Sequence, residues 1–133
     1  PSNHGYIVGG PAAVSPTVAA ELPADPFMGF MRVSGANRYE TAARLADVAF
    51  DGMGMLFSRP ALATGENFPD ALAGGVLQGS DCSPVLLTPS GRLDGDTESL
   101  LRKYKDHIYE IRFIGGDVAL KPAVRTKARS LLW

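Results

Sequence analysis

Cysteine, histidine and long apolar runs are scarce in this chain of 133 residues, and each shortage excludes something. Cys82 is the single cysteine, so an internal disulfide is excluded, although the cellular compartment stays open. Neither His4 nor His107 has a metal-ligating neighbour at helical spacing. No stretch approaches the roughly 20 apolar residues of a membrane span. We also recognise no signal peptide.

Net charge is also nearly absent, because 13 basic and 14 acidic side chains leave a value of −1. The overall field therefore does not recruit nucleic acid or an acidic membrane surface. Lysine and arginine are missing from residues 1–31, whereas residues 121–133 contain four basic side chains and no acid. That basic end is either a solvated helix face or half of an anion-binding surface.

Sequence motifs of catalysis and nucleotide binding are absent. The chain has no G-x-S-x-G nucleophile elbow, no G-x-G-x-x-G and no Walker lysine. Glu66 and Asp70 are four residues apart, but an acid in the first turn of a helix is explained by the helix dipole. We therefore expect no catalytic residue, no metal and no cofactor.

An internal repeat is the most informative feature. IVGGPAAVSPTV begins at Ile7, and FIGGDVALKPAV begins at Phe113, 106 residues later. Both glycines, an alanine, the proline and a valine recur in register. We therefore interpret residues 1–31 as the end of one unit and residues 32–133 as a nearly complete second unit. Together they are expected to form one compact domain.

Strand and helix patterns alternate along the second unit, which predicts a parallel sheet flanked by helices. Asn37 is the expected N-cap of the clearest helix, which ends near Gly52. We expect the short strand that begins at Tyr6 to join the sheet of the second unit. The predicted strands are 61–64, 84–88 and 108–114, and the other predicted helices start at Pro69, Asp94 and Pro122.

Three finer expectations concern burial. The helix from Pro69 should bury an apolar face of Ala71, Leu72, Val76 and Leu77. The run 84–88 is continuously apolar, as expected of a parallel strand covered on both faces. The run 108–114 alternates, with Tyr109, Ile111 and Phe113 on one face, and should lie near a sheet edge.

The Gly9–Gly10 and Gly115–Gly116 pairs each follow a predicted strand and lead to a helix start. Glycine there either lets the backbone approach a ligand or only permits a tight turn. The helix N-terminus that follows offers free N–H groups to an anion. Both interpretations of these turns remain open on the residues alone.

Four blocks occur in a characteristic order: RVSGANRYETAARLA from Arg32, ATGENFPDALAGG from Ala63, SPVLLT from Ser83 and RFIGGDVAL from Arg112. Together they resemble the type-2 cell-wall-binding repeat of Gram-positive surface and secreted proteins. The resemblance implies a Rossmann-like, three-layer α/β module in tandem copies. It also implies non-covalent, S-layer-like anchoring to an anionic glycopolymer or a teichoic-acid-like polymer, and an extracellular location at the cell wall or cell surface.

The resemblance also suggests site residues. The segment containing Pro84, Leu86 and Leu87 corresponds to the part of the family that lies near the packing and ligand groove. The R-x-S-G-x-x-R-Y segment supplies Arg32 and Arg38 as cations for the polymer. The complete set of expected ligand-binding residues is Arg32, Arg38, Asn67, Asp70, Pro84, Leu86, Leu87, Gly115 and Gly116.

Asn67 and Asp70 belong to the turn between a predicted strand and a predicted helix, at the edge of the sheet where open α/β folds bind ligands. We expect them to fix that loop and to be placed to hydrogen-bond a sugar. Two other functions remain open: a small α/β enzyme or nucleotide-binding domain with an unrecognised site, and a structural spacer. The expected partners are the wall polymer, neighbouring repeats and a second copy of the chain in a homo-oligomer.

Overall fold

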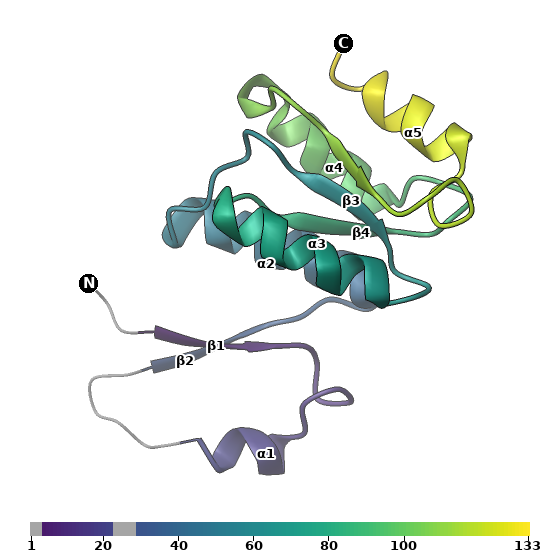
Figure 1. Cartoon of the computed structure of the whole chain (residues 1–133). Coiled ribbons are helices and arrows are strands. Elements are labelled where there is room, and N and C mark those ends of the chain that lie inside the picture. Colours follow the sequence, from purple (N-terminus) through teal and green to yellow (C-terminus); the bar gives the residue numbers. More distant parts are fainter. Residues whose placement is uncertain (1–3, 23–28) are drawn as a thin grey trace.

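The computed structural model describes residues 4–22 and 29–133 and contains two separate parallel sheets (Figure 1). One sheet pairs β1 with β2, and the other has the strand order β4-β3-β5. In chain order the elements are β1 (His4–Val8), α1 (Pro16–Ala20), β2 (Gly29–Val33), α2 (Arg38–Gly52), β3 (Ala61–Thr64), α3 (Pro69–Ser80), β4 (Val85–Thr88), α4 (Gly95–Lys103), the 3-10 helix η1 (Lys105–His107), β5 (Arg112–Ile114) and α5 (Pro122–Arg129).

Helices flank the three-stranded sheet, as predicted. In Figure 1, α3 lies on one face and α4 and α5 lie on the other, while α2 packs along the edge strand β4. All four residues of the central strand β3 are buried. The main core lies between the sheet and the helices α4 and α5, and includes Leu62, Leu86, Leu101 and Val124. This arrangement confirms the predicted α/β class.

The start of α2 is fixed by the predicted cap. The Asn37 side chain accepts hydrogen bonds from the backbone N–H groups of Tyr39 and Glu40, both at 2.9 Å. The Glu40 carboxylate reaches back to the N–H of Ala36 at 2.6 Å. These contacts satisfy free N–H groups at the helix start and position the first turn of α2.

The buried face of α3 is not the predicted one. Leu72, Val76 and Leu77 are exposed, whereas Gly74 and Gln78 are the buried residues of this helix. The reason is close packing: a Cβ at residue 74 would collide with Ile114 of β5. A glycine therefore faces the sheet, and the apolar side chains turn outward.

The two edge strands also depart from the expectations. Val85 and Leu87 of β4 are only partly buried, so the prediction of a strand covered on both faces was wrong for this strand. The strand β5 is confirmed as a sheet edge but spans three residues, because the N–H groups of Tyr109 and Glu110 both donate to the carbonyl of Ser58 and form no ladder. Tyr109 is consequently exposed while Ile111 is buried.

The prediction that the N-terminal strand joins the sheet of the second unit was wrong. β1 pairs with β2 in a sheet of two strands, in register from His4 opposite Gly29 to Val8 opposite Val33. The two sheets are separate, and the chain that runs from β2 into α2 connects them. The burial of Val33 at this junction ties the smaller sheet to the rest of the molecule.

Candidate functional site: a groove at the first Gly-Gly turn

The two Gly-Gly turns adopt the same local structure, as the repeat implies. Gly9 and Gly115 have φ values of +115° and +102°, a conformation that L-residues with a Cβ rarely adopt. In both copies the second glycine accepts hydrogen bonds from the N–H groups three and four residues later, at 2.9–3.1 Å. A short turn thus carries each strand towards a helix that begins with proline.

A surface groove runs between the Gly9–Gly10 turn and the start of α2, and we call it the turn groove. One wall is formed by the first Gly-Gly turn and the other by Asn37, Arg38 and the first turns of α2. Leu87 of β4 also lines it. The described residues that line it are Val8, Gly9, Gly10, Ala12, Ala13, Gly35, Ala36, Asn37, Arg38, Thr41, Ala42, Leu45 and Leu87.

Arg38 is the one charged residue among the described residues that line the turn groove. It occupies the first position of α2, where the helix dipole disfavours a cation. Its guanidinium donates a hydrogen bond to the carbonyl of Gly65, at the end of β3. No ion pair joins Arg38 to a carboxylate within residues 4–22 and 29–133, so the alternative of a pair with Glu66 or Asp70 is not observed.

Arg32 lies behind the same turn. Its guanidinium donates to the carbonyl of Gly9 at 2.6 Å, and the N–H of Gly9 donates to the carbonyl of Val33 at 2.8 Å. The contact fixes the first Gly-Gly turn against β2. Arg32 is therefore half-buried and positions the groove wall, whereas Arg38 is exposed at the groove.

The loop after β3 connects the turn groove to the carboxyl edge of the three-stranded sheet. The N–H of Glu66 donates to the Thr64 hydroxyl at 3.2 Å, and the Ser90 hydroxyl donates to the Glu66 carboxylate at 2.6 Å. This hydrogen bond from Ser90 lowers the pKa of Glu66. The loop is thus held by Thr64, Glu66 and Ser90, a role that the sequence had suggested for Asn67 and Asp70.

The remaining residues that we predicted to bind the ligand lie in two places, the carboxyl edge of the three-stranded sheet and the β4 segment. Asn67 is exposed in the loop after β3, and the Asp70 carboxylate lies against Gly115 so closely that a Cβ there would collide with it. Asn67, Asp70, Gly115 and Gly116 therefore gather at the carboxyl edge of the sheet, next to Gly65. Pro84 and Leu86 are buried, with Leu86 in the core, and Leu87 lines the turn groove.

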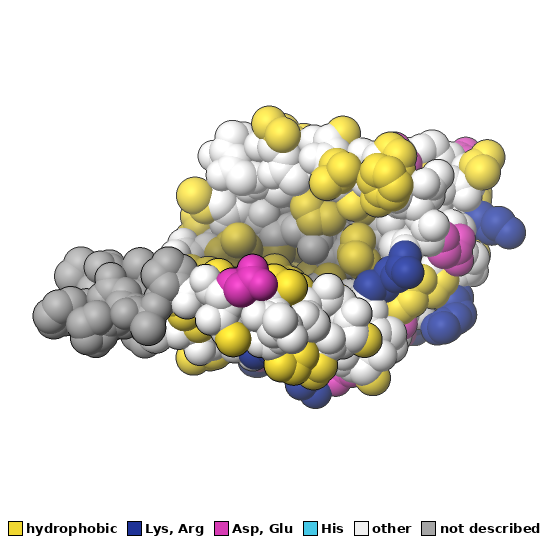
Figure 2. Space-filling view, turned by 90° about the horizontal axis from the view of Figure 1, so that it is seen from below, with side chains coloured by type: hydrophobic (Ala, Val, Ile, Leu, Met, Phe, Trp, Pro, Cys, Tyr) yellow, Lys and Arg dark blue, Asp and Glu magenta, His cyan; other side chains and the backbone are white. Residues whose placement is uncertain are grey.

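An apolar groove adjoins the turn groove between α2 and α3, and we call it the helix groove. The two share Ala42, Leu45 and Leu87. Its described lining also includes Val85 and Pro84 from the β4 segment and Phe68 and Leu72 from the start of α3. The space-filling view shows the hollow with hydrophobic side chains along its walls (Figure 2).

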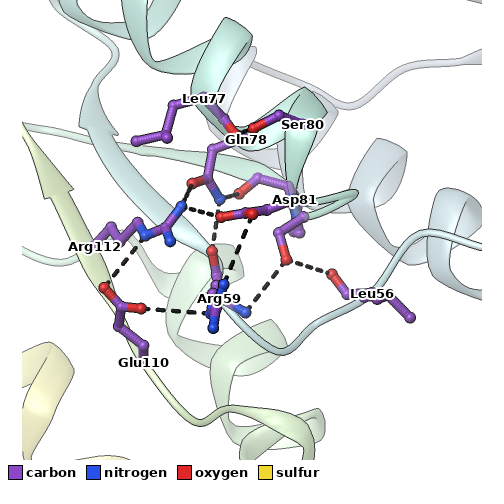
Figure 3. A network of polar contacts seen from close by, with 10 residues as sticks. Leu56, Arg59, Leu77, Gln78, Ser80, Asp81, Glu110 and Arg112 are labelled. Carbon is purple, nitrogen blue, oxygen red and sulfur yellow. Dashed lines mark hydrogen bonds and ion pairs between the residues drawn. The ribbon is translucent and has the colours of Figure 1, made fainter.

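A polar network that sequence reasoning missed lies at the opposite, amino edge of the sheet (Figure 3). Buried Gln78 donates to the carbonyls of Arg59 and Pro84 at 2.6 and 3.2 Å and accepts from Arg112 at 3.0 Å. Asp81 forms ion pairs with Arg59 and Arg112. The network joins α3 to β5 and to the residues that precede β3 and β4. None of its residues lines the turn groove, which indicates a structural role. A glutamine within an apolar stretch was the available signal.

Other kinds of site find no support in residues 4–22 and 29–133. No cluster of three or more histidine, cysteine, aspartate or glutamate side chains there could hold a metal ion. In the same part of the chain, no helix combines the length and the apolar character needed to cross a membrane.

A parallel α/β module with surface grooves at a strand-to-helix turn is a scaffold for binding. The comparison with protein families agrees: residues 32–125 match the model of Cell wall binding domain 2 (CWB2), and the chain belongs to this family. It is therefore a cell-wall-binding module, and it is located at the cell wall or cell surface. The expected family, fold class and location are confirmed.

Individual relatives match almost the whole chain. The N-acetylmuramoyl-L-alanine amidase LytC of Bacillus subtilis (strain 168) is 28% identical over 126 residues, which are 95% of this chain and 22% of LytC. Cwp8 from Clostridium difficile is similar with 26% identity and a TM-score of 0.70, over 98% of this chain and 20% of Cwp8. Cwp6 from the same organism has a TM-score of 0.82 at 20% identity, over 97% of this chain and 20% of Cwp6, and shows the fold alone.

The chain spans about a fifth of the length of these three relatives. The match to LytC therefore concerns one part of an amidase.

Proposed function

We propose that the chain is a non-catalytic module that binds an anionic wall polymer, a glycopolymer or a teichoic-acid-like polymer, in the turn groove. The exposed guanidinium of Arg38 is the observation that carries the proposal. It lies in a groove whose described lining contains no carboxylate, so its positive charge is not neutralised by a neighbour. A local cation of this kind attracts a polyanion even though the net charge of the chain is −1.

The other residues of the proposed site have roles that depend on where they lie relative to Arg38. Arg32 holds the first Gly-Gly turn in place, and Asn67 at the adjoining loop offers an amide to sugar hydroxyls. Gly115 and Gly116 form the second copy of the turn, and Leu87 joins the turn groove to the helix groove. The Asp70 carboxylate lies against Gly115 of the second turn and offers a hydrogen-bond acceptor to sugar hydroxyls.

The proposed arrangement in the parent protein is tandem. Residues 1–31 are the end of one repeat, residues 32–133 are the next repeat, and the two form one domain. The turn groove then lies between two repeats, because one wall is the Gly-Gly turn of the first and the other is α2 of the second. Non-covalent, S-layer-like anchoring of the parent protein follows from binding at several such grooves.

Retention on purified cell walls tests the proposal. We expect the full chain to bind walls and to lose binding when the anionic polymer is stripped from them. Arg38→Ala should raise the dissociation constant for walls by about tenfold, the equivalent of one charge-assisted contact of about 1.4 kcal/mol, and so lower the retained fraction. Binding should also fall at 0.5 M salt, where exposed charges are screened beyond about 4–5 Å.

The matched control is Arg102→Ala on α4, where the arginine pairs with Glu98 at 2.7 Å away from the grooves. Losing an exposed pair of this kind costs about 0.3–0.5 kcal/mol, so wall binding should stay unchanged. Equal retention of the chain, Arg38→Ala and Arg102→Ala on stripped and intact walls would contradict the proposal and favour a structural spacer.

A further inference from the structure

The outer edge of β5 has no strand partner among the described residues. β5 forms its ladder with β3, and the N–H of Arg112 donates to the carbonyl of Pro60 at 3.0 Å. Alternate residues of a strand direct their N–H and C=O groups to opposite sides. The backbone groups of Phe113 and the N–H of Gly115 therefore point away from β3, at an edge of the sheet.

The repeat supplies a second observation of the same strand. The offset of 106 residues places Tyr6 on Arg112, Ile7 on Phe113 and Gly9 on Gly115. The two turns that follow share positive φ at the first glycine and the same pair of backbone hydrogen bonds. β1 and β5 are thus two copies of one structural element.

In the first copy the corresponding edge is occupied. The N–H of Gly9 donates to the carbonyl of Val33, and β1 pairs with β2 in parallel, with Ile7 opposite Arg32. By the alternation along a strand, the groups that β1 directs at β2 belong to Ile7 and Gly9. Their equivalents are Phe113 and Gly115, the residues that face outward in β5.

We propose that the outer edge of β5 is the docking site for a strand of the β2 type, supplied by a following copy of the repeat. The register of β1 and β2 predicts the pairing: Phe113 opposite the incoming equivalent of Arg32, and Ile114 opposite that of Val33. The completed sheet then has four parallel strands, in the order β4, β3, β5 and the incoming strand.

Two features of the β5 edge fit this occupant. The carbonyl of Gly9 accepts from Arg32 of the paired strand, and a carbonyl oxygen can accept two hydrogen bonds. The carbonyl of Gly115 already accepts from Arg125 at 2.9 Å and keeps a second lone pair for the incoming arginine. The second feature is the edge itself. Its unpaired N–H and C=O groups form a template on which another strand can pair.

The pairing also explains the two separate sheets. β1 and β2 are then the last two strands of a sheet whose first two strands belong to the preceding repeat. The inference rests on backbone pairing and on the repeat, and it is independent of which polymer the turn groove binds.

A C-terminal extension of the full chain tests the inference. The offset of 106 places Trp133 on Phe27, so adding a second copy of residues 28–52 directly after Trp133 keeps the natural spacing. Amide hydrogen exchange is then followed by NMR. We expect the N–H groups of Phe113 and Gly115 to exchange at least tenfold more slowly in the extended chain, while the N–H of Arg112, already bonded to the carbonyl of Pro60, is unchanged.

The control extension carries Met31→Pro in the added segment. Proline removes the N–H that the register directs at the carbonyl equivalent to Gly5, namely that of Ile111, and it restricts the strand backbone. This extension should restore fast exchange at Phe113 and Gly115. Equal exchange at these two amides with and without the extension, in a chain whose core amide of Leu101 remains protected, would overturn the proposal.

Discussion

Gly74 of α3 lies directly against Ile114 of β5, with no room for a Cβ between them. The neighbouring Gly75 faces open space on the same helix. Two adjacent glycines of one helix therefore respond differently to alanine. The helix can approach the sheet only because residue 74 has no side chain.

We expect Gly75→Ala to raise the free energy of unfolding by up to about 1 kcal/mol, because alanine is the better helix former. Gly74→Ala gains the same propensity but crowds Ile114, and overpacking of this kind costs about 1–3 kcal/mol. Urea unfolding of both variants measures the difference. Equal stability of the two would show that α3 can move away from β5 without cost.

The second Gly-Gly turn offers another matched pair. Gly115 has φ of +102° and lies against the Asp70 carboxylate, whereas Gly116 is exposed with open space around it. Gly115→Ala should lower the free energy of unfolding by about 1–3 kcal/mol through backbone strain, with crowding added. Gly116→Ala should change it by less than about 0.5 kcal/mol. Thermal unfolding distinguishes them, and a harmless Gly115→Ala would contradict the strained turn.

How far the sequence predicts this fold depends on whether the signal is local. The start of α2 was predictable because Asn37 and Glu40 cap it within four residues. The buried face of α3 was not, because Gly74 contributes no hydrophobicity and Gln78 is polar, although these two residues face the sheet. Strand partners were not predictable either, since β1 has the same apolar character whichever sheet it joins.

The candidate site also combines features that the sequence predicts with features that depend on tertiary packing. The repeat identified both Gly-Gly turns, and Arg38 attracted attention because it opposes the dipole of α2. That the guanidinium reaches the carbonyl of Gly65, 27 residues away, depends on the packing of α2 against the sheet and has no sequence signal. The joining of the turn groove to the helix groove likewise depends on the packing of α2 along β4, because the residues that the two grooves share are Ala42, Leu45 and Leu87.

Gln78 provides a test of the buried network. Its exposed fraction is 1%, and it donates to the carbonyls of Arg59 and Pro84. Gln78→Leu keeps the volume but removes these donors, which should lower the free energy of unfolding by about 1–3 kcal/mol. Ser80→Ala, an exposed control at the end of the same helix, should cost less than about 0.5 kcal/mol. If urea unfolding gave similar values for both, the network would not stabilise the amino edge.

The outward apolar stripe of α3 predicts self-association. Leu72 and Val76 are exposed at 66% and 80%, and Leu72 borders the helix groove. Apolar surface of this kind is an association site. Sedimentation velocity should show the chain forming dimers or larger species as concentration rises, and Leu72→Ser with Val76→Ser should shift it towards monomer. Val118→Ser, 90% exposed outside the grooves, is the control and should leave the behaviour unchanged.

The last prediction concerns acid. The Asp47 carboxylate on α2 accepts from the Lys103 ammonium and from the Tyr104 hydroxyl of the α4 segment, both at 2.6 Å. Partial burial acts to raise its pKa, but the two hydrogen bonds outweigh burial and hold the pKa below its ordinary value of 3.8. The unfolded chain then binds a proton more readily than the folded one as the pH falls.

The stability contributed by Asp47 is therefore present above its unfolded pKa and is lost as the pH falls through the lower folded pKa. Asp47→Asn should be less stable than the natural chain at pH 7 and should lose less stability between pH 7 and pH 3, both measured by urea unfolding. Asp51→Asn, an exposed acid at the end of the same helix, should lose as much as the natural chain. An unchanged acid dependence in Asp47→Asn would mean that the contact between α2 and α4 does not depend on this charge.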